Sequence, residues 1–135
     1  MNIIVCLDER NGILFHNRRQ SRDAMLCADV MKISAGSTLR MNVYSAALFA
    51  DYSDHIKVSD DFLDIAQPQE FCFVENVSVF PAPKTIEKII VYRWNKKYPA
   101  DTFFSTEYLL DKQLLETMDF PGKSHPKITR EVYVG

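Results

Sequence analysis

The sequence predicts an α/β domain built on a mixed, mainly parallel sheet flanked by helices, with an antiparallel C-terminal strand. Asn2–Leu7 is an unbroken apolar run closed by turn residues, which is typical of a strand buried on both faces. Strand and helix patterns then alternate through residue 49, as at the start of an open α/β sheet. The last run, Ile128–Val134, alternates apolar and polar residues, so we expect an antiparallel strand with one wet face.

An amphipathic helix is expected after the first strand. Apolar residues recur at helical spacing over residues 24–31. Ser21 is placed to cap this helix, and Gly36 is placed to end it. A strand at residues 38–41 and a short helix at residues 44–49 follow, so the strand–helix order repeats.

The remaining elements are shorter and less regular. We expect a connection at residues 50–55, strands at 56–58, 70–74 and 88–94, and a short helix at 62–66. The sequence allows a short helix or a turn at residues 77–80, and a helical turn or a loop at residues 109–115. The run at 88–94 is dense in β-branched and aromatic residues, so it is predicted to be a central strand.

Length and composition indicate one globular domain that spans residues 1–135. A chain of 135 residues buries roughly 65–70% of its unfolded surface. Its 47% hydrophobic and 25% charged residues are ordinary for such a domain. The formal net charge of −2 gives no global basic field, which disfavours bulk binding of nucleic acid but leaves a local patch open.

The protein is expected to be cytoplasmic and to have no membrane segment. The sequence has no positively charged n-region before its first apolar run, and no apolar segment approaches the roughly 18 residues that span a bilayer. Cys6, Cys27 and Cys72 are odd in number, lack CxxC spacing and lie in apolar surroundings. We interpret them as reduced core residues rather than a disulfide or metal framework.

An arginine-rich loop precedes the first helix and contains the main binding candidates. Arg18, Arg19 and Arg22 fall within five residues, which makes this loop locally electropositive. Guanidinium groups bind phosphate or carboxylate in a bidentate manner, and a helix N-terminus next to them favours an anion. The alternative is a solvated loop whose arginines pair with nearby carboxylates of the chain.

Two polar residues at the start of the second helix are further binding candidates. Asn42 and Ser45 are placed to donate to an anion there, or simply to cap the helix. Asp23 is a weak catalytic candidate, as a displaced general acid. However, aspartate in the first turn of a helix is also favoured by the helix dipole alone.

The order and spacing of these elements resemble dihydrofolate reductase over nearly the whole chain. Residues 3–13 are similar to the first strand of that family and the start of its active-site loop, and residues 39–45 to the strand and helix start that carry its Gly-Arg-x-Thr motif. Residues 87–94, followed by residues 100–104, resemble its long strand and Gly-Asp-Thr-Phe-Phe-Pro segment. The resemblance implies a dihydrofolate reductase-like fold, with NADPH and a pterin as the ligands of an intact member.

The sequence departs from this family at the positions that carry its chemistry. Residues 19–22 read Arg-Gln-Ser-Arg in place of a Leu-Pro-Trp-like loop, and Asp23 falls a few residues early for the pterin-binding carboxylate. Residues 42–45 replace the phosphate-binding motif. Glu75 stands where paired glycines would let a pyrophosphate approach. We therefore expect a divergent member without reductase activity, for which NADPH is a disfavoured cofactor.

These observations favour one functional hypothesis and leave two others open. The first is a protein that binds a small anionic ligand or nucleotide between the arginine loop and the helix that begins near Ser45. The second is an NADPH-dependent reductase with an unfamiliar substrate. The third is an interaction module whose arginine loop contacts RNA or protein.

Zinc-dependent chemistry of the ribonuclease Z type is disfavoured. That activity requires a cluster of histidines and carboxylates around two zinc ions. The histidines of this chain, His16, His55 and His125, are isolated in the sequence. No metal site is therefore predicted.

Overall fold

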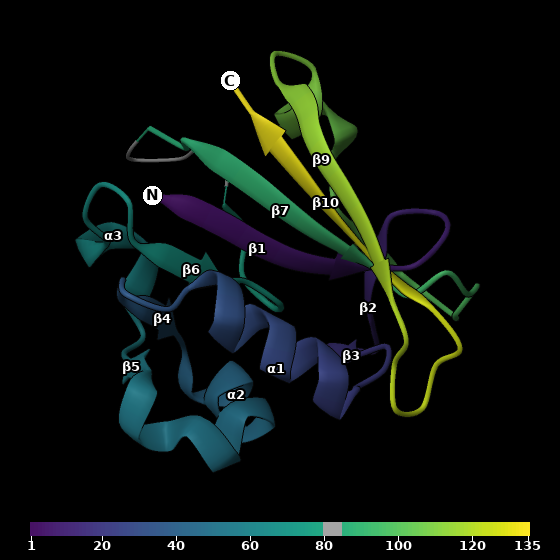
Figure 1. Ribbon diagram of the computed structural model, residues 1–135, viewed down its shortest axis with the longest axis horizontal. Coiled ribbons are helices and arrows are strands. Elements are labelled where there is room, and N and C mark those ends of the chain that lie inside the picture. The colour runs from purple at the N-terminus through teal and green to yellow at the C-terminus, as the bar shows by residue number, and fades with distance from the viewer. Residues whose placement is uncertain (80–84) are drawn as a thin grey trace.

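The computed structural model describes residues 1–79 and 85–135, and a seven-stranded sheet runs through its centre (Figure 1). The strand order is β5-β4-β6-β1-β7-β10-β9. Its strands are β1 (Asn2–Leu7), β4 (Leu39–Met41), β5 (Lys57–Val58), β6 (Phe71–Phe73), β7 (Lys88–Arg93), β9 (Gln113–Phe120) and β10 (Ile128–Val134). The first five pair in parallel, and β10 runs antiparallel to both β7 and β9. This confirms the mixed, mainly parallel sheet and its antiparallel C-terminal strand.

Two hydrophobic cores lie on opposite faces of the large sheet, and strand β1 contributes side chains to both. It pairs in parallel with β6 on one side and β7 on the other. Ile4 packs on one face with Leu26 and Val30, whereas Ile3 packs on the opposite face with Phe62 and other apolar residues. Because side chains of a strand alternate between faces, burial of both faces accounts for the unbroken apolar run.

Helix α1 (Ala24–Ile33) covers one face of the sheet (Figure 1). Its N-cap is Asp23, whose carboxylate accepts a hydrogen bond of 2.9 Å from the Met25 N–H. The prediction that Ser21 caps this helix is wrong, because the Ser21 hydroxyl lies beside the ring of His125 instead. The helix ends before Gly36, which has a φ of +84°, as expected for a glycine after a helix.

The other helices are short. They are α2 (Val43–Ala46), the 3-10 helix η1 (Ala47–His55), α3 (Phe62–Ile65) and the 3-10 helix η2 (Thr106–Leu109). The connection expected at 50–55 therefore forms part of a 3-10 helix, which is interrupted by non-helical backbone at Phe49 and Tyr52. No helix in the described ranges combines the length and apolar character needed to cross a bilayer.

Two segments differ from their sequence-based expectation or extend beyond the described residues. Residues 113–115 are strand rather than a helical turn or loop, because Gln113 and Leu114 pair with the end of β10. Residues 77–79 contain no helix, and Phe80, the last residue of the predicted helix or turn, lies outside the described residues.

A second, three-stranded sheet stands beside the carboxyl end of β1. It consists of β3 (Arg18–Arg19), β2 (Gly12–Phe15) and β8 (Thr102–Phe103), all antiparallel. His16 and Asn17 connect β2 to β3 with φ values of 50° and 60°, as in a two-residue type I′ turn. The arginine loop is thus partly a hairpin, which sends the side chains of Arg18 and Arg19 to opposite faces.

Candidate functional site

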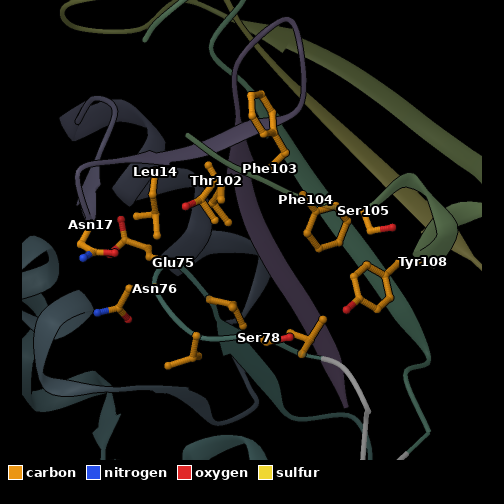
Figure 2. A pocket seen from close by; sticks show the side chains of 14 residues that line it. Leu14, Asn17, Glu75, Asn76, Ser78, Thr102, Phe103, Phe104, Ser105 and Tyr108 are labelled. Carbon is orange, nitrogen blue, oxygen red and sulfur yellow. The ribbon is translucent and has the colours of Figure 1, made fainter. Parts of the chain in front are cut away.

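A cleft of about 290 Å³ lies between the small sheet and the chain segment that follows β6. Its walls come from β2, from residues 74–79 and from residues 102–108. Residues 74–79 leave the carboxyl end of a parallel strand, which is where open α/β sheets collect ligands. In Figure 2, Phe104 and Tyr108 form one side of this cleft, and Asn17, Glu75 and Asn76 lie across from them.

The cleft presents aromatic and polar groups, and Glu75 is the charged residue in its described lining. The rings of Phe104 and Tyr108 lie 5.0 Å apart between centroids. The Asn76 side-chain oxygen accepts a hydrogen bond of 2.8 Å from Asn42 Nδ2. Among the described residues that line the cleft, none is Lys or Arg. The lining therefore suits a flat ring with hydrogen-bonding edges better than a phosphate.

Glu75 and Arg19 form a bidentate ion pair at the inner side of this cleft. Arg19 Nε donates to Glu75 Oε2 and Arg19 Nη2 to Glu75 Oε1, each over 2.9 Å. The Ser45 hydroxyl donates to the same Oε1 over 2.8 Å. Glu75 is only 7% exposed. Arg19 and Ser45, both predicted to hold an external anion, thus converge on a carboxylate of the chain itself.

Arg19 also contacts the ring, the hydroxyl and the carbonyl of Tyr44. The guanidinium carbon lies 4.4 Å from the ring centroid, and Arg19 Nη2 donates to the Tyr44 carbonyl over 3.1 Å. The Arg19 backbone N–H donates to the Tyr44 hydroxyl over 2.8 Å. Hydrogen bonding to Glu75 raises the pKa of Arg19, so the guanidinium stays charged. These contacts fix the guanidinium in one orientation.

Asn42 acts as a cap and a bridge. Its Oδ1 accepts from the Ser45 N–H over 3.1 Å, at the start of α2. Its Nδ2 donates to the side-chain oxygen of Asn76, and Asn42 is only 9% exposed. This amide is therefore already engaged within the chain. Asn42 therefore caps α2, which is the second of the two roles that the sequence allowed for it.

Arg18 and Arg22 are exposed and lie at separate hollows. Arg18 lines a shallow hollow of about 490 Å³ that Arg19 also borders. Arg22 lines another, of about 350 Å³, next to Asp51 and Lys123. The three arginines of the loop therefore do not meet in one pocket.

The space between the arginine loop and α1 is almost filled. Cys6, Ser21, Leu26 and Trp94 are among the residues around it, and its volume is about 10 Å³. That volume accommodates about one water molecule. A flat ring of pterin size does not fit there in this conformation.

Asp23 is buried and fully hydrogen-bonded. In addition to Met25, it accepts from the N–H groups of Lys123 and Ser124 at 2.9 and 2.8 Å and contacts His125 Nδ1 at 2.9 Å. Burial opposes its ionisation, but the bonds from Lys123, His125 and Ser124 outweigh it and hold the pKa of Asp23 well below its usual range. Asp23 is 4% exposed, so it ties α1 to the β9–β10 loop.

Sequence reasoning missed two side-chain networks. Glu75 meets Arg19 across 56 residues, and His125 meets Asp23 across 102 residues. A local sequence pattern cannot predict contacts between residues that lie so far apart in the sequence. Within residues 1–79 and 85–135, no group of three His, Cys, Asp or Glu residues is arranged to hold a metal ion.

Comparison with known proteins identifies the fold. No family model matches the sequence, and no curated protein sequence matches it. The structure matches dihydrofolate reductase from Enterococcus faecalis, solved in complex with NADP(H) and RAB-propyl, with a TM-score of 0.66. The match covers 98% of this chain and 94% of that chain. The chain has the dihydrofolate reductase fold.

The likeness is one of fold alone. Sequence identity with the Enterococcus faecalis enzyme is 11%, which agrees with the divergence expected from the altered motifs. The predicted dihydrofolate reductase-like fold is therefore confirmed. Because a fold does not determine function, the ligand and the activity have to be inferred from the residues of this chain.

Proposed function

We propose that the protein binds a small heterocyclic ligand of the nucleoside or nucleotide type in the cleft of Figure 2 and does not transfer hydride from NADPH. The ring of the ligand lies against Phe104 and Tyr108, with its polar edge toward Asn76. Arg18 lines a separate hollow at the outer face of the hairpin, so the proposal assigns the ring of the ligand to the cleft and no phosphate contact to Arg18.

The Arg19–Glu75 pair is the observation that carries this proposal. A pyrophosphate that approached this part of the cleft would face the carboxylate of Glu75, whose partner cation is already engaged. Moving Arg19 away would leave a buried charge unpaired, which costs about 3–5 kcal/mol in typical proteins. The pair thus opposes a dinucleotide and leaves the uncharged part of the cleft for a ring.

The absence of room beneath the arginine loop supports loss of reductase chemistry. The space there holds about 10 Å³. The nearest acid, Asp23, has its oxygens occupied by bonds to the Met25 N–H and the β9–β10 loop. A pterin would therefore find neither space nor an available carboxylate.

Calorimetric titration with a panel of nucleosides and nucleoside monophosphates tests the proposal. Val77→Trp fills the cleft from its exposed rim, and Val43→Trp adds the same side chain on α2, outside the cleft. We expect saturable binding to the wild type and to Val43→Trp, with at least a tenfold weaker affinity for Val77→Trp. Equal affinity in both variants, or no binding across the panel, contradicts the proposal. Affinity that falls steeply with salt and follows Arg18 would favour RNA instead.

A further inference from the structure

Ser21, His125 and Asp23 form a chain of contacts in the order of a nucleophile, a base and an orienting acid. Ser21 Oγ lies 3.1 Å from His125 Nε2. His125 Nδ1 lies 2.9 Å from Asp23 Oδ2. None of these three residues lines the cleft of Figure 2. This is the geometry by which acyl-transfer sites are recognised on unrelated folds.

The surrounding structure fixes the imidazole. The ring of His125 stacks on Trp94 with centroids 4.7 Å apart and an interplanar angle of 27°. Asp23 is held in turn by the N–H groups of Lys123 and Ser124. Because an ionised Asp23 can only accept, Nδ1 is the donor to it, and in the neutral ring Nε2 is the acceptor. The base therefore faces Ser21 in the tautomer that nucleophilic catalysis requires.

The nucleophile is also reachable from outside. Ser21 is partly exposed, whereas His125 and Asp23 are 6% and 4% exposed. Gln20, which precedes Ser21, lines the hollow of about 490 Å³ that contains Arg18. Ser21 itself borders the nearly filled space of about 10 Å³ beneath the arginine loop, so a small ester would have to enter from the side of Gln20 and Arg18.

We propose that Ser21 is the nucleophile of a hydrolytic site for small carboxylic esters, with His125 as its general base and Asp23 as the residue that positions His125. Ser21 Oγ bonds to the acyl carbon and its proton passes to His125 Nε2. The bond to the alkoxy group breaks, and His125 returns the proton to the leaving alcohol. Water then attacks the acyl carbon, which releases the carboxylic acid and restores Ser21.

The Tyr98 hydroxyl competes with Ser21 for His125 in the free protein. Its hydroxyl lies 2.8 Å from His125 Nε2 and 3.3 Å from Ser21 Oγ. A neutral imidazole offers one acceptor at Nε2, so Tyr98 and Ser21 compete for it. Replacing Tyr98 with Phe removes the competitor and leaves the Ser21–His125 contact in place.

Labelling with a fluorophosphonate probe, mapped by peptide mass spectrometry, tests the proposal. We expect the adduct on Ser21 of the folded wild type, no adduct in Ser21→Ala at that peptide, and an unchanged rate in the control Ser53→Ala. The rate should fall at least ~100-fold in His125→Gln, as for loss of a general base. It should rise in Tyr98→Phe.

Several outcomes would overturn this site. They are the absence of an adduct on Ser21 in the folded wild type, an undiminished rate in folded His125→Gln, and an unchanged or lower rate in Tyr98→Phe. If circular dichroism shows that His125→Gln does not fold, the wild-type adduct map and the Tyr98→Phe rate still decide. Hydrolysis of p-nitrophenyl acetate by the same variants gives a second readout, for which the same order of rates is expected.

Discussion

Arg19 and Glu75 are joined by two parallel hydrogen bonds, each of 2.9 Å, although they lie 56 residues apart in the sequence. The side chain of Glu75 is 6% exposed and that of Arg19 is 20% exposed. The pair connects the small sheet to the segment after β6, next to the cleft. It therefore contributes to stability and also determines which ligands the cleft can accept.

Removing the charge of Glu75 should destabilise the fold. In Glu75→Gln the Arg19 guanidinium keeps its place but loses an ionic partner, so we expect the free energy of unfolding to fall by about 2–3 kcal/mol. Urea denaturation measures this loss. Arg18→Gln, on the exposed face of the same hairpin, is the matched control and should stay within about 0.5 kcal/mol of the wild type.

A double-mutant cycle separates the pair from its surroundings. Arg19→Met with Glu75→Gln should destabilise less than the sum of the two single changes, because the second change no longer leaves a charge unpaired. Strict additivity of the two unfolding free energies would show that the residues do not act together.

Asp23 should make stability depend on pH in the acid range. Its folded pKa is lowered, whereas an unfolded aspartate titrates near ~3.9. The unfolded chain therefore binds the proton more readily, and this contribution is fully present above about pH 5 and is lost as the pH falls. Asp23→Asn should be less stable at neutral pH and lose less stability on acidification. Parallel pH profiles for the two proteins would contradict this role.

The Tyr92 hydroxyl should stabilise the core through Asp29. Tyr92 is fully buried, and its hydroxyl donates to Asp29 Oδ2 over 2.6 Å. Burial and this bond raise the pKa of Tyr92, which keeps the phenol protonated. Tyr92→Phe should lower the free energy of unfolding by about 1–2 kcal/mol. Tyr52→Phe, a partly exposed tyrosine of η1, should change it little, and equal losses in the two variants would argue against a specific bond.

The cysteines should react slowly with thiol reagents in the folded protein. Cys27 and Cys72 are buried, and burial raises the pKa of the Cys27 thiol to about 11. Burial also raises the pKa of Cys6. Because the thiolate is the reactive form, we expect little colour from Ellman's reagent at pH 8 and rapid reaction of all three thiols in urea. Full reaction without denaturant would show that the core opens readily.

The sequence predicted the sheet better than the site, for physical reasons. Unbroken apolar runs such as Asn2–Leu7 mark buried parallel strands by themselves, and the alternation in Ile128–Val134 marks the antiparallel one. The arginine loop illustrates the limit of local patterns. Its composition indicated an anion site, but the partner of Arg19 is Glu75, which only the folded chain brings near.

The helix cap shows the same limit on a smaller scale. Ser21 and Asp23 are both good N-cap residues, so the sequence alone could not choose between them. Asp23 takes the cap because it also receives three bonds from Lys123 and Ser124 of the distant β9–β10 loop. Ser21 is then left to contact His125.

Equilibrium titration of the wild-type protein with NADPH tests the central claim most directly, namely that a dihydrofolate reductase fold persists here without its dinucleotide site. We predict no saturable binding up to about 1 mM cofactor, which corresponds to a binding free energy weaker than about −4 kcal/mol. Saturable binding of NADPH to the wild type in the micromolar range would contradict it.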